Sequence, residues 1–258
     1  MFASSQVHGL RFAFGTLSVL PVRVSRWDRE AARGGMLCAP LVGGVIGGLA
    51  AGVGLALLWL GAGALLAAVG SAAVPAVLTR GLHLDGIADT ADGLGSGKPA
   101  EDALRIMKQS DIGPFGVITL VFVLLGQVAA LARAYDDSWA RGAVATVVAA
   151  VVARLALTLA ARAGVPAARP EGLGAAVAGV VPVGGAVGVV VAVLVAAGGG
   201  GLLVGSYGPV VAVVVALAAS ELLLRHCTRR FGGVTGDVFG ALAETAATTA
   251  LVVLSFGA

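Results

Sequence analysis

Three aspartates at fixed spacing are the residues of this chain best suited to chemistry. Asp85, Asp89 and Asp92 lie at positions i, i+4 and i+7 of one short segment. On a helix of about 3.6 residues per turn they fall within about 60° of one face. The outer two α-carbons would be about 10 Å apart, which is too far for all three carboxylates to hold one small ion. Either Gly86 breaks the helix or two ions bind.

A second acidic pair lies near the end of the chain. Asp237 and Glu244 are again seven residues apart and share a helix face, so we expect the two acidic faces to meet. Carboxylates clustered without histidine or thiolate ligands favour a hard cation such as Mg²⁺ or Mn²⁺, which takes further oxygens from water and substrate phosphates. The acids therefore predict phosphoryl-group chemistry. The alternative is that Asp85, Asp89 and Asp92 only solvate a loop.

Hydropathy identifies the elements that must position these acids. The chain is 58% hydrophobic and 12% charged, and its mean hydropathy is +0.98, outside the range of soluble domains. Its long apolar stretches lack the alternating polarity of the strands of a membrane β-barrel. We predict an all-α, polytopic transmembrane helical bundle that forms a single integral membrane domain over residues 1–258. About seven runs are long enough to cross about 30 Å of hydrocarbon: 37–60, 62–79, 113–132, 142–161, 174–197, 202–224 and 238–256.

Basic residues predict the orientation of the bundle. Lys and Arg are retained in short cytoplasmic loops. With the N-terminus in the cytoplasm, all 17 basic residues except Arg133 and Arg141 fall on the inner side. The acidic segment 80–112 then faces the cytoplasm between the second and third crossings. Because the charges are spread over separate loops without interleaved aromatic residues, they argue against a nucleic-acid partner.

Several motifs, taken together, resemble those of the adenosylcobinamide-GDP ribazoletransferases, also called cobalamin-5′-phosphate synthases. They run in the order of that family and cover nearly the whole chain: Pro40–Gly43, Gly81–Gly95, Ala103–Lys108, Ile112–Gly116, Ala168–Gly174 and Arg230–Asp237. Many members look like Met-Lys-Asp-Ser-Arg where this chain has Met-Lys-Gln-Ser-Asp at 107–111. We therefore carry over no charged role to Gln109 or Asp111.

The resemblance implies a transferase that joins α-ribazole or its 5′-phosphate to adenosylcobinamide-GDP and releases GMP, the nucleotide-loop assembly step of cobalamin synthesis. It implies Mg²⁺ as cofactor and the plasma membrane of a prokaryote as location. The acids agree with this, because attack of a ribose hydroxyl on a diphosphate phosphorus needs charge neutralisation and positioning. The expected partners are the two small-molecule substrates and membrane lipid, with a homo-oligomer as an open alternative to a monomer.

We assign expected roles on this basis. The Mg²⁺ ligands are Asp85, Asp89, Asp92 and Asp237, with Asp237 closing the site from the last helix. The general base is open between His83, Asp237 and Glu244, the first two being preferred. Cationic and hydroxyl side chains suit the substrate phosphates, and the candidates are Lys108, Ser110, Arg154, Arg169, Arg229 and Arg230.

Arg154 has a second interpretation. An arginine about halfway into an apolar run is costly unless it pairs or meets water. Pairing with an acid such as Glu221 and contact with substrate are therefore equally open.

Two other classes of protein remain as alternatives. A CDP-alcohol phosphotransferase-like enzyme also uses membrane aspartates and Mg²⁺, but its pattern has an arginine where Asp85-Gly86 here leads to Ala88-Asp89. An ion-coupled transporter would show repeated halves with paired broken helices. Acids gathered at one membrane face, without a repeat, argue against a transporter.

Overall fold

All regular elements in the described part of the chain are helices, which confirms the predicted fold class. The computed structural model describes residues 2–256. The helices are α1 (Phe2–Leu17), α2 (Arg29–Trp59), α3 (Ala64–Leu78), α4 (Leu82–Gly95), α5 (Ala100–Ile106), α6 (Pro114–Asp137), α7 (Trp139–Ala160), α8 (Leu173–Val177), α9 (Val183–Val204), α10 (Gly208–Phe231) and α11 (Gly236–Ser255).

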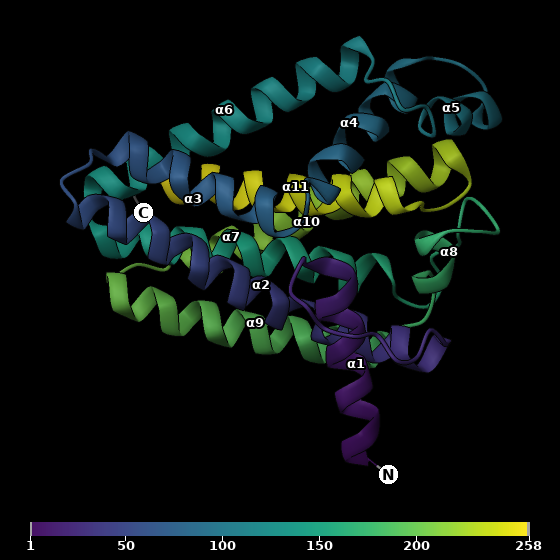
Figure 1. The fold of residues 1–258 in the computed structure, drawn as a ribbon, viewed down its shortest axis with the longest axis horizontal. Coiled ribbons are helices and arrows are strands. Elements are labelled where there is room, and N and C mark those ends of the chain that lie inside the picture. Colours follow the sequence, from purple (N-terminus) through teal and green to yellow (C-terminus); the bar gives the residue numbers. More distant parts are fainter. Residues whose placement is uncertain (1, 257–258) are drawn as a thin grey trace.

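The long helices form a bundle suited to a membrane. Six of the described helices, α2, α6, α7, α9, α10 and α11, are long and apolar enough to cross it, and the bent pair of α3 and α4 raises the number to as many as seven. In Figure 1 these helices run along the long axis, with α4, α5 and α8 at one end and the C-terminus at the other. The prediction of about seven crossings is confirmed, while the orientation of the N-terminus stays a prediction.

Two predicted crossings are wrong at their boundaries. The predicted crossing 174–197 begins too early, because the crossing helix α9 starts only at Val183. The short helix α8 ends at Val177, Gly179 has a φ of +68° and Pro182 precedes α9. The run 202–224 begins too early, since Gly205 at φ +65° ends α9. Glycine in the left-handed region ends helices. Hydropathy does not register such breaks within a run of apolar residues.

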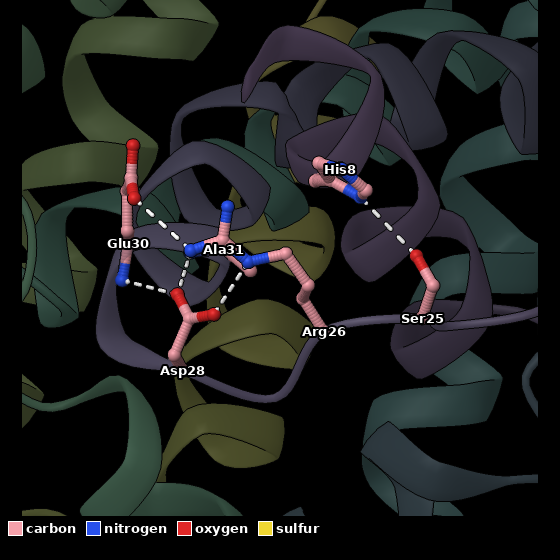
Figure 2. A network of polar contacts seen from close by, with 6 residues as sticks. All are labelled: His8, Ser25, Arg26, Asp28, Glu30 and Ala31. Carbon is pink, nitrogen blue, oxygen red and sulfur yellow. Dashed lines mark hydrogen bonds and ion pairs between the residues drawn. The ribbon is translucent and has the colours of Figure 1, made fainter. Parts of the chain in front are cut away.

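A polar network fixes the start of the first crossing. Asp28 caps α2: its Oδ1 accepts the backbone N–H groups of Glu30 and Ala31, both at 3.0 Å, and its Oδ2 accepts from Arg26 Nε at 2.6 Å (Figure 2). The backbone bond from Ala31 and the bond from Arg26 lower the pKa of Asp28. The ring Nδ1 of His8 on α1 lies 3.1 Å from the hydroxyl of Ser25. These contacts hold α1 beside the beginning of α2.

The sharpest change of direction separates α3 from α4, whose axes meet at 86°. Two successive residues in the turn are left-handed, Arg80 at φ +53° and Gly81 at φ +70°. Arg80 is the one non-glycine residue with positive φ in the described part of the chain. Because of this turn, α4 leaves the direction of α3, and α4 is not among the six helices that are long enough to cross on their own. The turn brings the acidic motif across the end of the bundle.

Candidate active site

The acidic residues of α4 meet Asp237 where α4 crosses the beginning of α11. A Cβ atom added to Gly86 would lie 2.6 Å from the carbonyl oxygen of Asp237 and 3.0 Å from Cα of Gly240. Only glycine therefore permits this approach. The helix α4 continues through Gly86, so the alternative that Gly86 breaks it is wrong.

Replacing Gly86 by alanine is expected to separate the two helices. The added methyl group forces backbone shifts, which typically cost about 1–3 kcal/mol. The matched control is Gly48→Ala in α2, where a Cβ would meet nothing within 4 Å. Thermal unfolding in detergent should show a lower melting temperature for Gly86→Ala and an unchanged or higher one for Gly48→Ala. Equal melting temperatures would contradict the close contact.

Asp92 is directed toward the beginning of α6. Its Oδ2 accepts the N–H of Gly113 at 2.7 Å and its Oδ1 accepts that of Gly116 at 2.9 Å. The first amides of a helix lack partners within the helix and favour an anion. A Cβ at either glycine would collide with these carboxylate oxygens. Both oxygens of Asp92 thus have partners in the protein.

Two cavities meet at Asp85. The larger has a volume of about 790 Å³ and lies between the end of α1, the start of α4 and the loop before α6; its lining includes Arg80, Asp89 and Ser110. The smaller has a volume of about 290 Å³, and its lining includes His83 and Asp237. Asp85 lines both cavities. A group held at Asp85 is therefore reachable from either side.

Arg169 and Thr235 position Asp237. Nη1 of Arg169 lies 3.7 Å from Oδ2 of Asp237, and its Nη2 donates to the carbonyl oxygen of Leu104. The hydroxyl of Thr235 donates to the same Oδ2 at 3.2 Å, and it also caps α11 by accepting the N–H of Val238 at 3.2 Å. The carboxylate is thus held at the first turn of α11, beside the smaller cavity.

The acids repel one another in the absence of a cation. Burial, followed by the charges of Asp85, Asp237 and Asp92, raises the pKa of Asp89 to about 7. Among the described residues, no three His, Cys, Asp or Glu side chains are close enough to hold a metal ion by themselves. Mg²⁺ keeps several waters and commonly binds one or two carboxylates together with substrate phosphates, so an ion at this place would take most of its ligands from water and substrate.

His83, on α4, lines the smaller cavity together with Asp85 and Asp237. Its side chain is buried, and its Nε2 has no hydrogen-bond partner in the structure. Burial and the charge of Arg154 hold the pKa of His83 well below its usual range. The imidazole is therefore neutral at pH 7 and retains an unprotonated ring nitrogen.

Arg154 and Glu244 lie in a different place from the other predicted site residues. Both line a small cavity of about 50 Å³ within the bundle. Glu244 accepts from Gln127 Nε2 at 2.8 Å, whereas Nε and Nη2 of Arg154 have no partner. Pairing of Arg154 with Glu221 is wrong, because Glu221 instead accepts from Arg162 at 2.9 Å.

The remaining candidates lie at the surface of the same end of the bundle. Ser110 lines the larger cavity. Lys108 is exposed, with its Nζ 3.5 Å from Glu171. Arg230 donates to the carbonyl oxygen of Lys98, and Arg229 is exposed at the end of α10. Neither Arg229 nor Arg230 lines the two cavities at Asp85.

Residues outside the predicted set complete the walls of the larger cavity. Arg80 lines it, as do Thr16 and Ser18 at the end of α1. The position of Arg80, directly before the glycine that begins the acidic motif, is the one signal in the sequence that points to it. Thr16 and Ser18 carry no such signal, since nothing in their neighbourhood predicts that α1 returns to α4.

Comparison with known proteins identifies relatives over nearly the whole chain. The family model described as cobalamin-5-phosphate synthase matches residues 9–255. An adenosylcobinamide-GDP ribazoletransferase of Frankia casuarinae is 43% identical over 95% of this chain and 93% of the relative. Its counterpart in a Nocardioides species is 42% identical over 94% and 96%. No solved structure matches.

Proposed function

Because the chain belongs to the cobalamin-5-phosphate synthase family, we propose that it is an adenosylcobinamide-GDP ribazoletransferase. It joins α-ribazole or its 5′-phosphate to adenosylcobinamide-GDP and releases GMP. One structural observation carries the proposal beyond the likeness in sequence. Asp85 lines both cavities, with Asp89 in the larger one and Asp237 in the smaller one, which suits a reaction between two bound substrates at a diphosphate.

The products define which phosphorus reacts. Since GMP keeps one phosphate, the acceptor hydroxyl attacks the phosphorus on the corrinoid side of the diphosphate. A bond forms between that phosphorus and the hydroxyl oxygen, and the bond to the bridging oxygen breaks with its electrons going to GMP. Such transfers depend on in-line positioning and on stabilisation of charge more than on covalent catalysis.

Asp85 and Asp89, together with water and the substrate diphosphate, would hold the Mg²⁺ that this family resemblance implies, and Asp237 lies beside them on α11. Burial raises the pKa of Asp89 most, and the charges of Asp85, Asp237 and Asp92 raise it further; this accumulation of negative charge supports a cation there. When bound, Mg²⁺ neutralises charge on the diphosphate and on the departing GMP. Asp92, whose oxygens accept from α6, holds the loop and helix around the site in this proposal.

Asp237 is the better placed of the two preferred candidates for the general base. Its side chain is 26% exposed, whereas Nε2 of His83 is buried. Glu244 lies in a separate cavity and takes no part in this proposal. The proton of the attacking hydroxyl passes to the Asp237 carboxylate, which the cationic Arg169 beside it holds in position.

The excess of Lys and Arg on the inner side favours a site that faces the cytoplasm at the plasma membrane. The relatives are bacterial proteins, and the apolar helices need lipid around them.

Purified protein in liposomes tests the proposed function. With adenosylcobinamide-GDP, α-ribazole and Mg²⁺, we expect one GMP per corrinoid product. A CDP-alcohol phosphotransferase would instead release CMP from a CDP-activated alcohol, and a transporter would release no nucleotide. Absence of GMP from the complete mixture, with the folded state verified by its melting transition, would overturn the proposal.

Mg²⁺ affinity is expected to rise with pH around neutrality. The ion requires the ionised Asp89 carboxylate, whose pKa of about 7 leaves it partly protonated at pH 6. The Mg²⁺ concentration for half-maximal GMP release should fall by about fivefold from pH 6 to pH 7, by about tenfold in all from pH 6 to pH 8, and change little above pH 8. An Mg²⁺ requirement that is constant from pH 6 to 8 would contradict Asp89 as a ligand.

A further inference from the structure

We propose that the two cavities are separate substrate subsites, with the larger binding the nucleotide-activated diphosphate donor and the smaller binding the acceptor nucleoside. Arg80 binds the phosphates of the donor in the larger cavity. The assignment rests on the proposed function and names where each substrate lies. It also gives a role to a residue outside the acidic and basic motifs.

The volumes of the cavities match the sizes of the two substrates. A volume of about 290 Å³ lies at the lower end of the range of small-molecule sites, about 300–1,000 Å³, and suits one nucleoside. The larger cavity, at about 790 Å³, admits a nucleotide with its diphosphate. The corrinoid macrocycle then remains outside, at the open side of the larger cavity.

The lining of the smaller cavity suits an aromatic base joined to a sugar. Leu17, Met36 and Phe239 supply apolar surface, and His83 and Arg169 supply polar groups. Small-molecule sites typically combine mostly apolar walls with a few polar groups that orient the ligand. The buried Nε2 of His83, which lacks a partner, is available to a ligand hydroxyl that reaches it.

Arg80 is suited to the donor phosphates by its position. Arg80 is an exposed residue that lines the larger cavity together with Asp85 and Asp89. Arg169 and Arg162 have carboxylate partners, whereas no hydrogen bond or ion pair of the Arg80 guanidinium is found among the described residues. A guanidinium group binds phosphate oxygens in a bidentate manner.

The backbone at Arg80 supports a role for its side chain. Left-handed conformation costs about 1–2 kcal/mol for a residue other than glycine, and such strained positions cluster at functional sites. The turn between α3 and α4 would accept glycine at φ +53° without this cost. An arginine at this position therefore contributes something that the fold alone does not require.

Asp85 places the reacting groups between the subsites. The acceptor hydroxyl enters from the smaller cavity, and the corrinoid-side phosphorus enters from the larger one. As the new oxygen–phosphorus bond forms, the bond to the bridging oxygen breaks, GMP leaves through the larger cavity and the hydroxyl proton passes to Asp237. Each atom thus enters and leaves from the side on which its substrate is bound.

Arg80→Gly tests the phosphate contact without disturbing the turn, because glycine favours the observed φ. The KM for adenosylcobinamide-GDP should rise at least tenfold, while the KM for α-ribazole changes less than twofold. Arg80→Lys should recover part of the loss, since it keeps the charge but not the bidentate geometry. Arg23→Gly, at an exposed arginine outside the two cavities, should change neither KM.

A pair of cavity-filling variants tests the partition itself. Ile112→Trp narrows the larger cavity and Leu173→Trp the smaller one. The first should raise only the donor KM and the second only the acceptor KM, each about tenfold or more. Leu202→Trp, 85% exposed on α9, is the matched control.

The outcomes separate the two proposals. Wild-type protein that releases no GMP overturns the proposed function. Wild-type protein that releases GMP, combined with KM changes that are reversed, shared equally or absent in these variants, overturns the assignment of subsites. An unchanged donor KM in Arg80→Gly overturns the role of Arg80.

Discussion

Asp89→Asn is expected to lower kcat for GMP release about 10³-fold or more while the protein stays folded. Asparagine keeps the size of the side chain but removes the charge that holds Mg²⁺ in the proposed site. Single groups that stabilise charge in phosphoryl transfer are worth about 10³–10⁵ in rate. Turnover measured across a magnesium titration gives the kcat and shows whether excess ion restores it.

The stability of the same variant provides the control for folding. The pKa of Asp89 is raised in the folded protein, so ionising this carboxyl above its unfolded value near pH 4 costs stability as the pH rises toward 7. Asn removes that cost, and at pH 8 the melting temperature should be equal to or above that of the wild type. Asp136→Asn, at a largely exposed side chain at the far end of α6, should leave both kcat and stability unchanged. Near-normal turnover of Asp89→Asn at ordinary magnesium would overturn the metal site.

The second large effect is expected in the buried cavity of Arg154 and Glu244. Arg154 is only 3% exposed, and Glu244 is the acid that shares its cavity. No ion pair joins the two side chains, but they carry opposite charges in one cavity, so removing either charge leaves the other less compensated. Loss of one member of a buried charged pair typically costs about 3–5 kcal/mol, and Glu244→Leu and Arg154→Met should each lower stability by up to this amount, whereas the double variant should recover most of it.

Unfolding in detergent measures these differences, and Glu221→Gln serves as the comparison at the partly exposed ion pair of Glu221 with Arg162. Its loss should be about 1 kcal/mol or less. Additive losses in the double variant would show that the two charges do not stabilise each other. Recovery of stability without recovery of turnover would return Arg154 to the list of substrate-binding residues.

The sequence was sufficient to predict the helices and the meeting of the two acidic motifs, because both predictions depend on local patterns. Hydropathy identifies the crossings, and helical periodicity places Asp85 and Asp89 toward one side. The contact between Gly86 and Asp237 agrees with the expected meeting of the two motifs. These predictions required only the geometry of single helices and the apolar nature of the bundle.

The same patterns could not predict what lies opposite each side chain. Asp92 follows the periodicity of the other aspartates, but its partners are amides of Gly113 and Gly116 on another helix. Glu244 shares a face with Asp237, yet seven residues advance a helix by about 10 Å, which carries Glu244 from the end of the bundle into a separate cavity. Helical periodicity gives the direction of a side chain and not its depth among the neighbouring helices.

The meeting of α4 with α11 also has a consequence for synthesis of the protein. Helices leave the ribosome in order from the N-terminus, so α2 through α10 are made before Asp237 is translated. Until α11 inserts, the face of α4 at Gly86 has no helix against it and Asp85 has no opposing carboxylate. In the proposed mechanism, a nascent chain that ends before α11 therefore lacks both the helix that packs on α4 and the carboxylate that accepts the proton. Turnover then requires the insertion of α11.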